Sequence, residues 1–165
     1  MTIVDVQVSP AVVDWPGLRE AALAAESAGF GAFHVFDHLA GVPLGGDSMI
    51  ESFALLGALA EATSTIELGA MVINVWNRQV GTLVTAAASV AHLSGRRFHL
   101  GIGAGSSPTS PWAAEQHAAG HHVEPLLGPR QERVQHVLDL AASTWDPGRA
   151  DHLTTFPLPS PRPTI

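Results

Sequence analysis

The sequence predicts a parallel α/β fold, because strand-like and helix-like segments alternate four times along the chain. Short runs rich in apolar and β-branched residues predict strands over residues 3–8, 32–36, 66–73 and 97–102. Each run is followed by a segment whose apolar residues recur at helical spacing. The third run is almost wholly apolar toward its end, which is typical of a strand buried on both faces of a parallel sheet.

Local end signals predict the four helices. Asp14 and Pro16 indicate the start of the first helix, because a carboxylate caps free N–H groups and proline tolerates the first turn. Gly29 ends that helix. The other helices are expected near residues 51–62, 80–91 and 129–146, with a long loop over 103–128 and an irregular, proline-rich tail over 147–165.

Composition and charge exclude several classes of protein. The 165 residues include no cysteine, which excludes a disulfide framework and is compatible with a reducing cytoplasm. The net charge of −7, with no Lys/Arg cluster beyond Arg96 and Arg97, argues against nucleic-acid binding. The chain shows no basic leader and no apolar run of roughly 18 residues, so we expect a cytoplasmic protein without a membrane span.

Polar or glycine-rich segments follow three of the predicted strands, where parallel strands bring their carboxyl ends to one edge. His38 is the candidate for proton transfer, because imidazole titrates near neutrality and the adjacent Asp37 would orient or charge it. The alternative is an Asp–His pair that only caps a helix or holds a loop. Asn74 would donate a hydrogen bond to a bound ring or close the backbone of its own strand.

The glycine-rich end of the fourth strand predicts a place where a ligand approaches the backbone. Glycine lacks a Cβ atom, so the N–H groups of Gly103, Ala104, Gly105 and Ser106 are expected to contact an anionic or planar group. The alternative is a tight turn at the edge of the sheet. A dinucleotide-binding fingerprint is disfavoured, because Ser106 stands where the third glycine belongs and the segment follows the fourth strand.

Nine histidines raise the question of a metal site, but their spacing argues against one. His117, His121 and His122 fall in the predicted loop, and no HExxH motif is present. We therefore predict no metal. Trp76 and Trp112 would either flank a planar substrate or pack against loops.

Two architectures satisfy these patterns. One is a doubly wound sheet, for which the length of the chain is sufficient. The other is a (β/α)8 barrel, which usually takes about 250 residues, so that four β/α units make half of it. Sequence periodicity does not separate the two.

Four segments resemble, in the same order, signatures of the luciferase-like monooxygenase family, which includes bacterial luciferase and F420-dependent oxidoreductases. They are residues 26–39, 59–69, 93–105 and 128–145. The resemblance implies a (β/α)8 TIM barrel of which this chain, a single domain over residues 1–165, follows the N-terminal half. Residues 1–146 would supply four β/α units, and residues 147–165 would lead toward a fifth strand that is cut short.

The resemblance also implies a cofactor, either the deazaflavin coenzyme F420 or FMN. We expect F420, because the Asp37–His38 pair and the glycine-rich loop look most like that branch, with FMN as the alternative. His38 would lie beside the cofactor ring, and Asp37 would hydrogen-bond near it. Met71 and Val72 match the position of a non-proline cis peptide that supports the ring in many relatives; the alternative is an ordinary buried strand.

Two functions follow as expectations. The first is an oxidoreductase of the luciferase-like type that transfers hydride between the reduced cofactor and a small organic substrate, with His38 managing the proton. The second is a non-catalytic half-barrel, either a remnant or a module that associates with itself or a partner through its exposed sheet edges.

Overall fold

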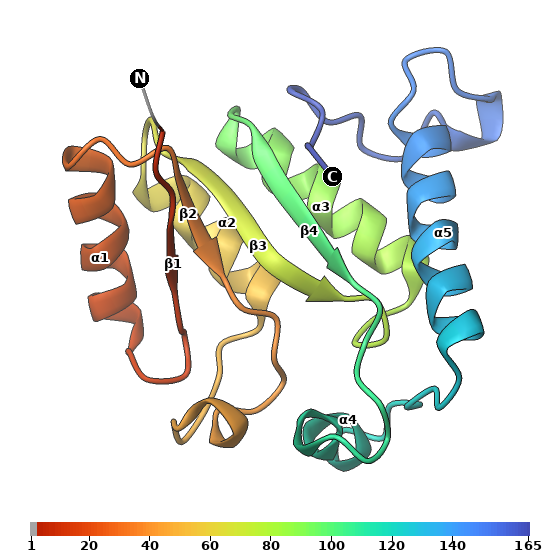
Figure 1. Ribbon diagram of the computed structural model, residues 1–165. Coiled ribbons are helices and arrows are strands. Elements are labelled where there is room, and N and C mark those ends of the chain that lie inside the picture. Colours follow the sequence, from red (N-terminus) through yellow and green to blue (C-terminus); the bar gives the residue numbers. More distant parts are fainter. Residues whose placement is uncertain (1–2) are drawn as a thin grey trace.

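The computed structural model describes residues 3–165, which form one parallel sheet with helices packed against it (Figure 1). The strands β1 (Val6–Val8), β2 (Ala32–Val35), β3 (Glu67–Asn74) and β4 (Phe98–Gly103) pair in the order β1-β2-β3-β4. The main helices are α1 (Trp15–Ser27), α2 (Ser52–Ala62), α3 (Val80–Ser94) and α5 (Leu127–Thr144). A short helix, α4 (Ala114–Ala118), lies beyond the carboxyl ends of the strands.

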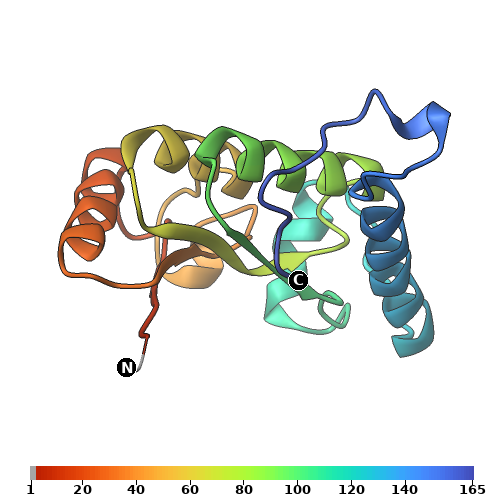
Figure 2. The same cartoon turned by 90° about the horizontal axis from the view of Figure 1, so that it is seen from above.

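The strand order separates the two architectures that the sequence leaves open. All three strand pairs are parallel and follow the order of the chain, and α1, α2 and α3 lie on the same face of the curved sheet (Figure 2). A doubly wound sheet reverses its strand order and carries helices on both faces. Sequential strands covered on one side are instead the arrangement of a barrel segment, so the chain forms a partial (β/α)8 barrel.

The helix-covered face of the sheet holds the apolar core. Side chains alternate along each strand, and those that face the helices are buried, among them Phe33, Val35, Leu68, Phe98 and Leu100. They pack against apolar residues of the helices, including Leu18, Leu56, Leu59, Leu83 and Val137. Burial of this apolar surface is the main force that holds the helices to the sheet.

The opposite face of the sheet, which we call the open face, is the one that α1, α2 and α3 do not cover in Figure 2. It carries polar pairs: His34 Nε2 lies 3.3 Å from Asp5 Oδ2, and His99 Nε2 lies 2.6 Å from Glu67 Oε2. The two imidazole rings are 5.6 Å apart. The strand pleat therefore separates an apolar face from a polar one.

Two predicted segments differ from the structure. Strand β1 begins at Val6 rather than at residue 3, because it pairs only with β2 and leaves Ile3 and Val4 exposed. The predicted loop over 103–128 contains a 3₁₀ turn, η2 (Pro111–Ala113), and then α4. Ser110 begins this turn by accepting a hydrogen bond from the N–H of Trp112 at 3.2 Å, a local signal that the sequence prediction overlooked.

The proline-rich tail returns to the edge of β4. Thr164 pairs in parallel with His99, donating its N–H to the carbonyl of Phe98 at 2.9 Å and accepting from the N–H of Leu100 at 2.8 Å. Thr164 thus lies beside β4, where the next strand of a barrel would pair. Over the described part of the chain, no helix combines the length and apolar character needed to cross a membrane.

Candidate functional site

The loops that follow β2, β3 and β4 enclose a cavity of about 310 Å³, which we call the rim cavity. It is lined by Asp37, His38, Val72, Asn74, Gly103, Ala104, Gly105, Ser106, Trp112 and Glu115. The structure thus brings together eight of the nine residues predicted for the site. Met71 is the exception, because its side chain lines a smaller cavity on the open face with His34 and His99.

The imidazole of His38 is held by a buried carboxylate from a distant part of the chain. Its Nδ1 lies 2.8 Å from Oε1 of Glu115, whose other oxygen accepts from the N–H groups of Leu39 at 2.8 Å and Ala40 at 3.0 Å. Burial alone would raise the pKa of Glu115, but the hydrogen bonds from His38 and these two N–H groups lower it. An ionised Glu115 only accepts hydrogen bonds, so His38 carries a proton on Nδ1 and leaves Nε2 free.

Asp37 does not orient His38, contrary to the sequence prediction. Its fully buried carboxylate accepts from Ser52 Oγ at 2.7 Å, from the N–H of Asn74 at 2.9 Å, and from both Nη atoms of Arg78 at 2.9 and 2.6 Å. The two neighbouring side chains have separate partners, because Asp37 is engaged by residues around the end of β3 whereas His38 contacts Glu115 of α4. Asp37 therefore ties the ends of β2 and β3 together, while His38 turns toward α4.

Arg78 and Glu115 were missed as site residues. Arg78 joins Asp37 to Glu51 and Ser52, and its guanidinium lies 4.9 Å from the ring of Phe53. Its signal in the sequence was its place directly after the third strand, at the edge where the strands end. Glu115 falls in the predicted loop over 103–128, and no local pattern shows that it reaches a histidine 77 residues away.

The glycines of the β4 loop are required by protein contacts. A Cβ atom on Gly103 would lie 2.7 Å from Cγ2 of Val72, and one on Gly105 would lie 2.7 Å from Cδ1 of Trp76. Gly105 also has a positive φ of +83°. These contacts explain the glycines as parts of a tight turn, which was the alternative interpretation.

The backbone of the same loop still offers donors to a ligand. Among residues 3–165, no hydrogen-bond partner is found for the N–H groups of Ala104, Gly105 and Ser106. Beside them, Val72 and Trp112 present apolar surface and are 44% and 45% exposed. The peptide bond between Met71 and Val72 is cis, as the resemblance led us to expect. The rim cavity thus combines free donors, apolar walls and one free imidazole nitrogen.

The histidines considered for a metal lie in and after α4. Within the described residues, no group of three or more His, Cys, Asp or Glu side chains could hold a metal ion. Trp112 lines the rim cavity, and its ring lies 5.3 Å from that of His38. Trp76 instead packs behind the glycine loop, with the guanidinium of Arg133 4.5 Å from its ring.

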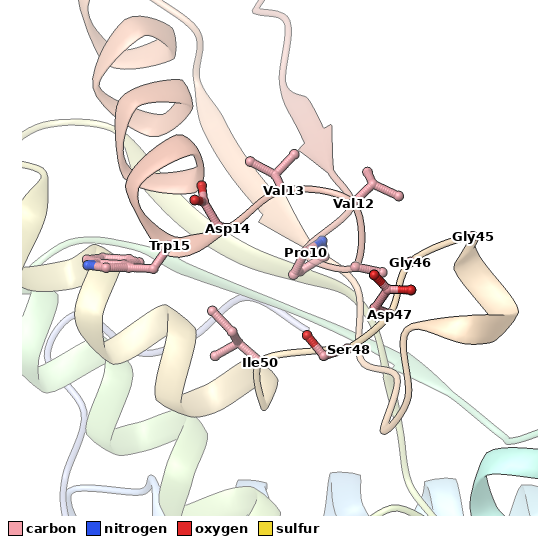
Figure 3. A pocket seen from close by; sticks show the side chains of 11 residues that line it. Pro10, Val12, Val13, Asp14, Trp15, Gly45, Gly46, Asp47, Ser48 and Ile50 are labelled. Atoms are coloured by element: carbon pink, nitrogen blue, oxygen red, sulfur yellow. The ribbon is translucent and has the colours of Figure 1, made fainter.

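A larger cavity, of about 520 Å³, lies between the β1–α1 loop and the segment before α2 (Figure 3). The residues labelled in Figure 3 come from these two loops and from Trp15 at the start of α1, with Trp15 and Ile50 among the apolar ones. Of its two carboxylates, Asp14 is already used to cap α1, accepting from the N–H of Gly17 at 3.0 Å. The cavity contains none of the predicted site residues and no imidazole.

Comparison with known families agrees with this geometry. The family described as luciferase-like monooxygenase matches residues 2–163, nearly the whole chain. The chain belongs to this family. A search among curated proteins finds no match.

Solved structures with the same fold confirm the partial barrel of this luciferase-like chain. The coenzyme F420-dependent tetrahydromethanopterin reductase of Methanopyrus kandleri has a TM-score of 0.69 at 16% identity, over 99% of this chain and 47% of its own. An F420-dependent secondary alcohol dehydrogenase in complex with an F420–acetone adduct has a TM-score of 0.72 at 17% identity, over 89% and 43%.

An FMN-bound structure also has this fold. It is the oxygenating constituent of 3,6-diketocamphane monooxygenase from Pseudomonas putida, with a TM-score of 0.65 at 18% identity, over 87% of this chain and 39% of its own. The luciferase-like chain therefore spans less than half the length of these three structures. At these identities the likeness establishes the fold.

Proposed function

We propose that this chain supplies half of the active site of a flavin-type oxidoreductase, which transfers hydride between reduced F420 or FMN and a small organic substrate. The observation that carries the proposal is His38, which a buried carboxylate holds with one ring nitrogen free at the rim cavity. F420- and FMN-dependent enzymes among the structures of the same fold support a cofactor of this kind. We favour F420, because the Asp37–His38 pair and the glycine loop resemble that branch.

The residues of the rim cavity fit a planar ring with polar edges. Val72 and Trp112 offer apolar contact, and the free N–H groups of residues 104–106 would supply donors to acceptor atoms of such a ring. When bound, the cofactor supplies the carbon that gives or takes the hydride. Asn74 is held in the wall, because its backbone N–H donates to Asp37 and its side-chain Oδ1 accepts from the N–H of Trp76 at 3.0 Å.

His38 acts as the proton acceptor and donor in this proposal. Its Nε2 takes the proton that a substrate hydroxyl loses when hydride leaves the adjacent carbon, and returns it in the reverse reaction. The contact of Nδ1 with Glu115 keeps the ring oriented. Asp37 takes the role of a positioning residue, since its carboxylate is already occupied by Arg78, Ser52 and Asn74.

A cofactor titration tests the proposal. Ring fluorescence of F420 and FMN is followed as the purified chain is added, and saturable binding is expected. Ala104→Phe fills the rim cavity and should abolish the binding, whereas the matched variant Ala119→Phe changes an exposed alanine after α4 and should leave it intact. Equal binding by the two variants, or none by the native chain, would contradict the proposal.

The open face favours the second candidate, a half-barrel that associates with another copy of the chain. Met71 and Val72 are about half exposed there, and β1 and β4 are the edges of the sheet. Sedimentation velocity, which measures the oligomeric state, together with the cofactor titration separates the two functions. A dimer with no affinity for either cofactor would favour the associating module, and a chain that binds F420 with micromolar affinity would favour the oxidoreductase.

A further inference from the structure

A further cavity, of about 220 Å³, lies behind Trp76 and is distinct from the rim cavity. It is lined by Trp76, Arg78, Gln79, His121, His122 and Arg133, which come from the β3–α3 loop, the segment after α4, and α5. Its walls include two arginines and two histidines but no aspartate or glutamate. We call it the basic cavity.

Arg133 is the feature that distinguishes the basic cavity. Its Nε donates to the carbonyl of Val75 at 2.7 Å, and its Nη2 donates to the carbonyl of Arg78 at 2.9 Å. These two bonds and the stacking on Trp76 hold the guanidinium in one orientation. No carboxylate within the described residues pairs with it, and burial lowers the pKa of Arg133.

Arg78 lies in the same wall, but its guanidinium is paired with carboxylates. Its guanidinium is neutralised by Asp37 and Glu51, so its charge is not available to a ligand. Arg133 keeps an uncompensated positive charge and a free Nη1 group at a partly desolvated position. Such a cation is stabilised when an anion binds beside it, because charge-assisted hydrogen bonds strengthen as water is excluded.

We propose that the basic cavity binds an oxyanion, the phosphate or carboxylate group of a small molecule. Arg133 supplies the charge, and the side chains of Gln79 and His121 supply further donors at the cavity wall. No hydrogen bond within the described residues engages the imidazole of His121, whereas that of His122 lies 3.1 Å from Glu124 and 5.3 Å from the ring of Trp76.

Trp76 connects the basic cavity to the glycine loop. The position of a Cβ atom on Gly105 lies 2.7 Å from Trp76, and Arg130 donates to the carbonyl of Gly105 at 3.1 Å. An anion bound behind Trp76 therefore lies next to the loop that lines the rim cavity. Two sources of the anion fit this place, a phosphate carried by the cofactor and a separate anionic substrate.

Titration with inorganic phosphate tests the site without any cofactor. Tryptophan fluorescence reports occupancy, because Trp76 forms part of the wall. The native chain should show saturable binding, and Arg133→Gln and His121→Ala should each raise the Kd at least tenfold. Arg149→Gln is the matched control, since Arg149 also donates only to backbone carbonyls but lines none of the cavities described above, and the Kd of this variant should not change.

His121→Ala guards against loss of structure, because it leaves the carbonyl bonds of Arg133 in place; circular dichroism checks the fold of every variant. Failure of the native chain to bind phosphate saturably, or an unchanged Kd in both site variants, would overturn the proposal.

A competition experiment identifies the source of the anion. Phosphate that weakens binding of FMN but not of riboflavin assigns the cavity to the cofactor's phosphate. Phosphate that binds while leaving both affinities unchanged assigns it to a separate anion. Absence of cofactor binding would refute the proposed function, but the phosphate titration would still show whether the basic cavity binds an oxyanion.

Discussion

The two ends of the sheet use carboxylates in the same way but with different results. At the amino end, Glu26 of α1 accepts from the N–H groups of Ser64 at 2.8 Å, Ile66 at 2.9 Å and Thr65, and so holds the loop that enters β3. At the carboxyl end, Glu115 holds the N–H groups of Leu39 and Ala40. Both carboxylates fix a loop through its backbone.

The difference lies in what else each carboxylate touches. Glu26 bonds only to the loop, with Oγ1 of Thr65 as its further partner at 3.0 Å. Glu115 also binds an imidazole that lines the rim cavity. A carboxylate that only closes a loop contributes stability, whereas one that also holds a titratable group beside a cavity prepares that group for chemistry. Four predictions test this distinction, from the largest expected effect to the smallest.

Removing Asp37 should break the carboxyl end of the sheet. Asp37→Ala leaves Arg78 without its buried partner, and breaking such a pair costs about 3–5 kcal/mol in the free energy of unfolding. Asp5→Ala is the control on the open face, because the side chain of Asp5 is 45% exposed and its pair with His34 contributes at most about 1 kcal/mol. Urea denaturation measures the free energy of unfolding of both variants, and equal losses would contradict the special role of Asp37 at the carboxyl end of the sheet.

His38 and His99 each pair with a carboxylate, but only His38 lines the rim cavity. His38→Ala should lower F420-dependent turnover by about 100-fold or more, the usual contribution of general acid–base catalysis. His99→Ala should leave turnover within about twofold, since its pair with Glu67 lies outside that cavity. Turnover is followed by the absorbance of F420. Similar losses in the two variants would show that His38 has no special role.

Gly29 and Gly105 have nearly the same positive φ, +79° and +83°, at opposite ends of the sheet. Alanine at either position costs about 1 kcal/mol in backbone strain. Gly105→Ala should cost about 1–2 kcal/mol more, because its Cβ would press on Trp76, whereas nothing lies within 4 Å of a Cβ on Gly29. Thermal denaturation compares the two, and an equal loss would argue against tight packing of the glycine loop.

The lowered pKa of Glu26 predicts how the stability of the amino end of the sheet depends on pH. Burial would raise its pKa, but the hydrogen bonds from residues 64–66 lower it from 4.5 to about 2. Because the pKa of Glu26 is lower in the folded state than its ordinary value, the ionised side chain stabilises the fold at any pH above 4.5. This stability is lost as the pH falls from 4.5 toward 2.

Glu26→Gln should therefore cost about 1 kcal/mol at pH 7 and flatten the loss of stability between pH 5 and pH 2. Glu20→Gln, on the exposed surface of the same helix, should change neither quantity. Urea midpoints measured across this pH range test the prediction, and an unchanged slope in Glu26→Gln would contradict it.

Much of the fold could be predicted from the sequence, because strand and helix patterns are local. The apolar face of the third strand, the cap at Asp14 and the stop at Gly29 each depend on residues within one or two turns. The short helix α4 was missed, since five residues carry too little periodicity to distinguish them from a loop. The order of the strands could not be derived from periodicity, because both alternatives use the same alternation.

By itself, the sequence determined the four β/α units, the edge of the sheet where polar residues gather, and the membership of eight residues in one cavity. It did so because parallel strands carry their carboxyl ends to a common edge. Only the tertiary structure decided that Glu115 pairs with His38 and that Asp37 pairs with Arg78. Asp37 and His38 are neighbours in the chain, yet one pairs with Arg78 and the other with Glu115. The partner of His38 comes from 77 residues away, because α4 folds over the strand ends, and no local pattern records that approach.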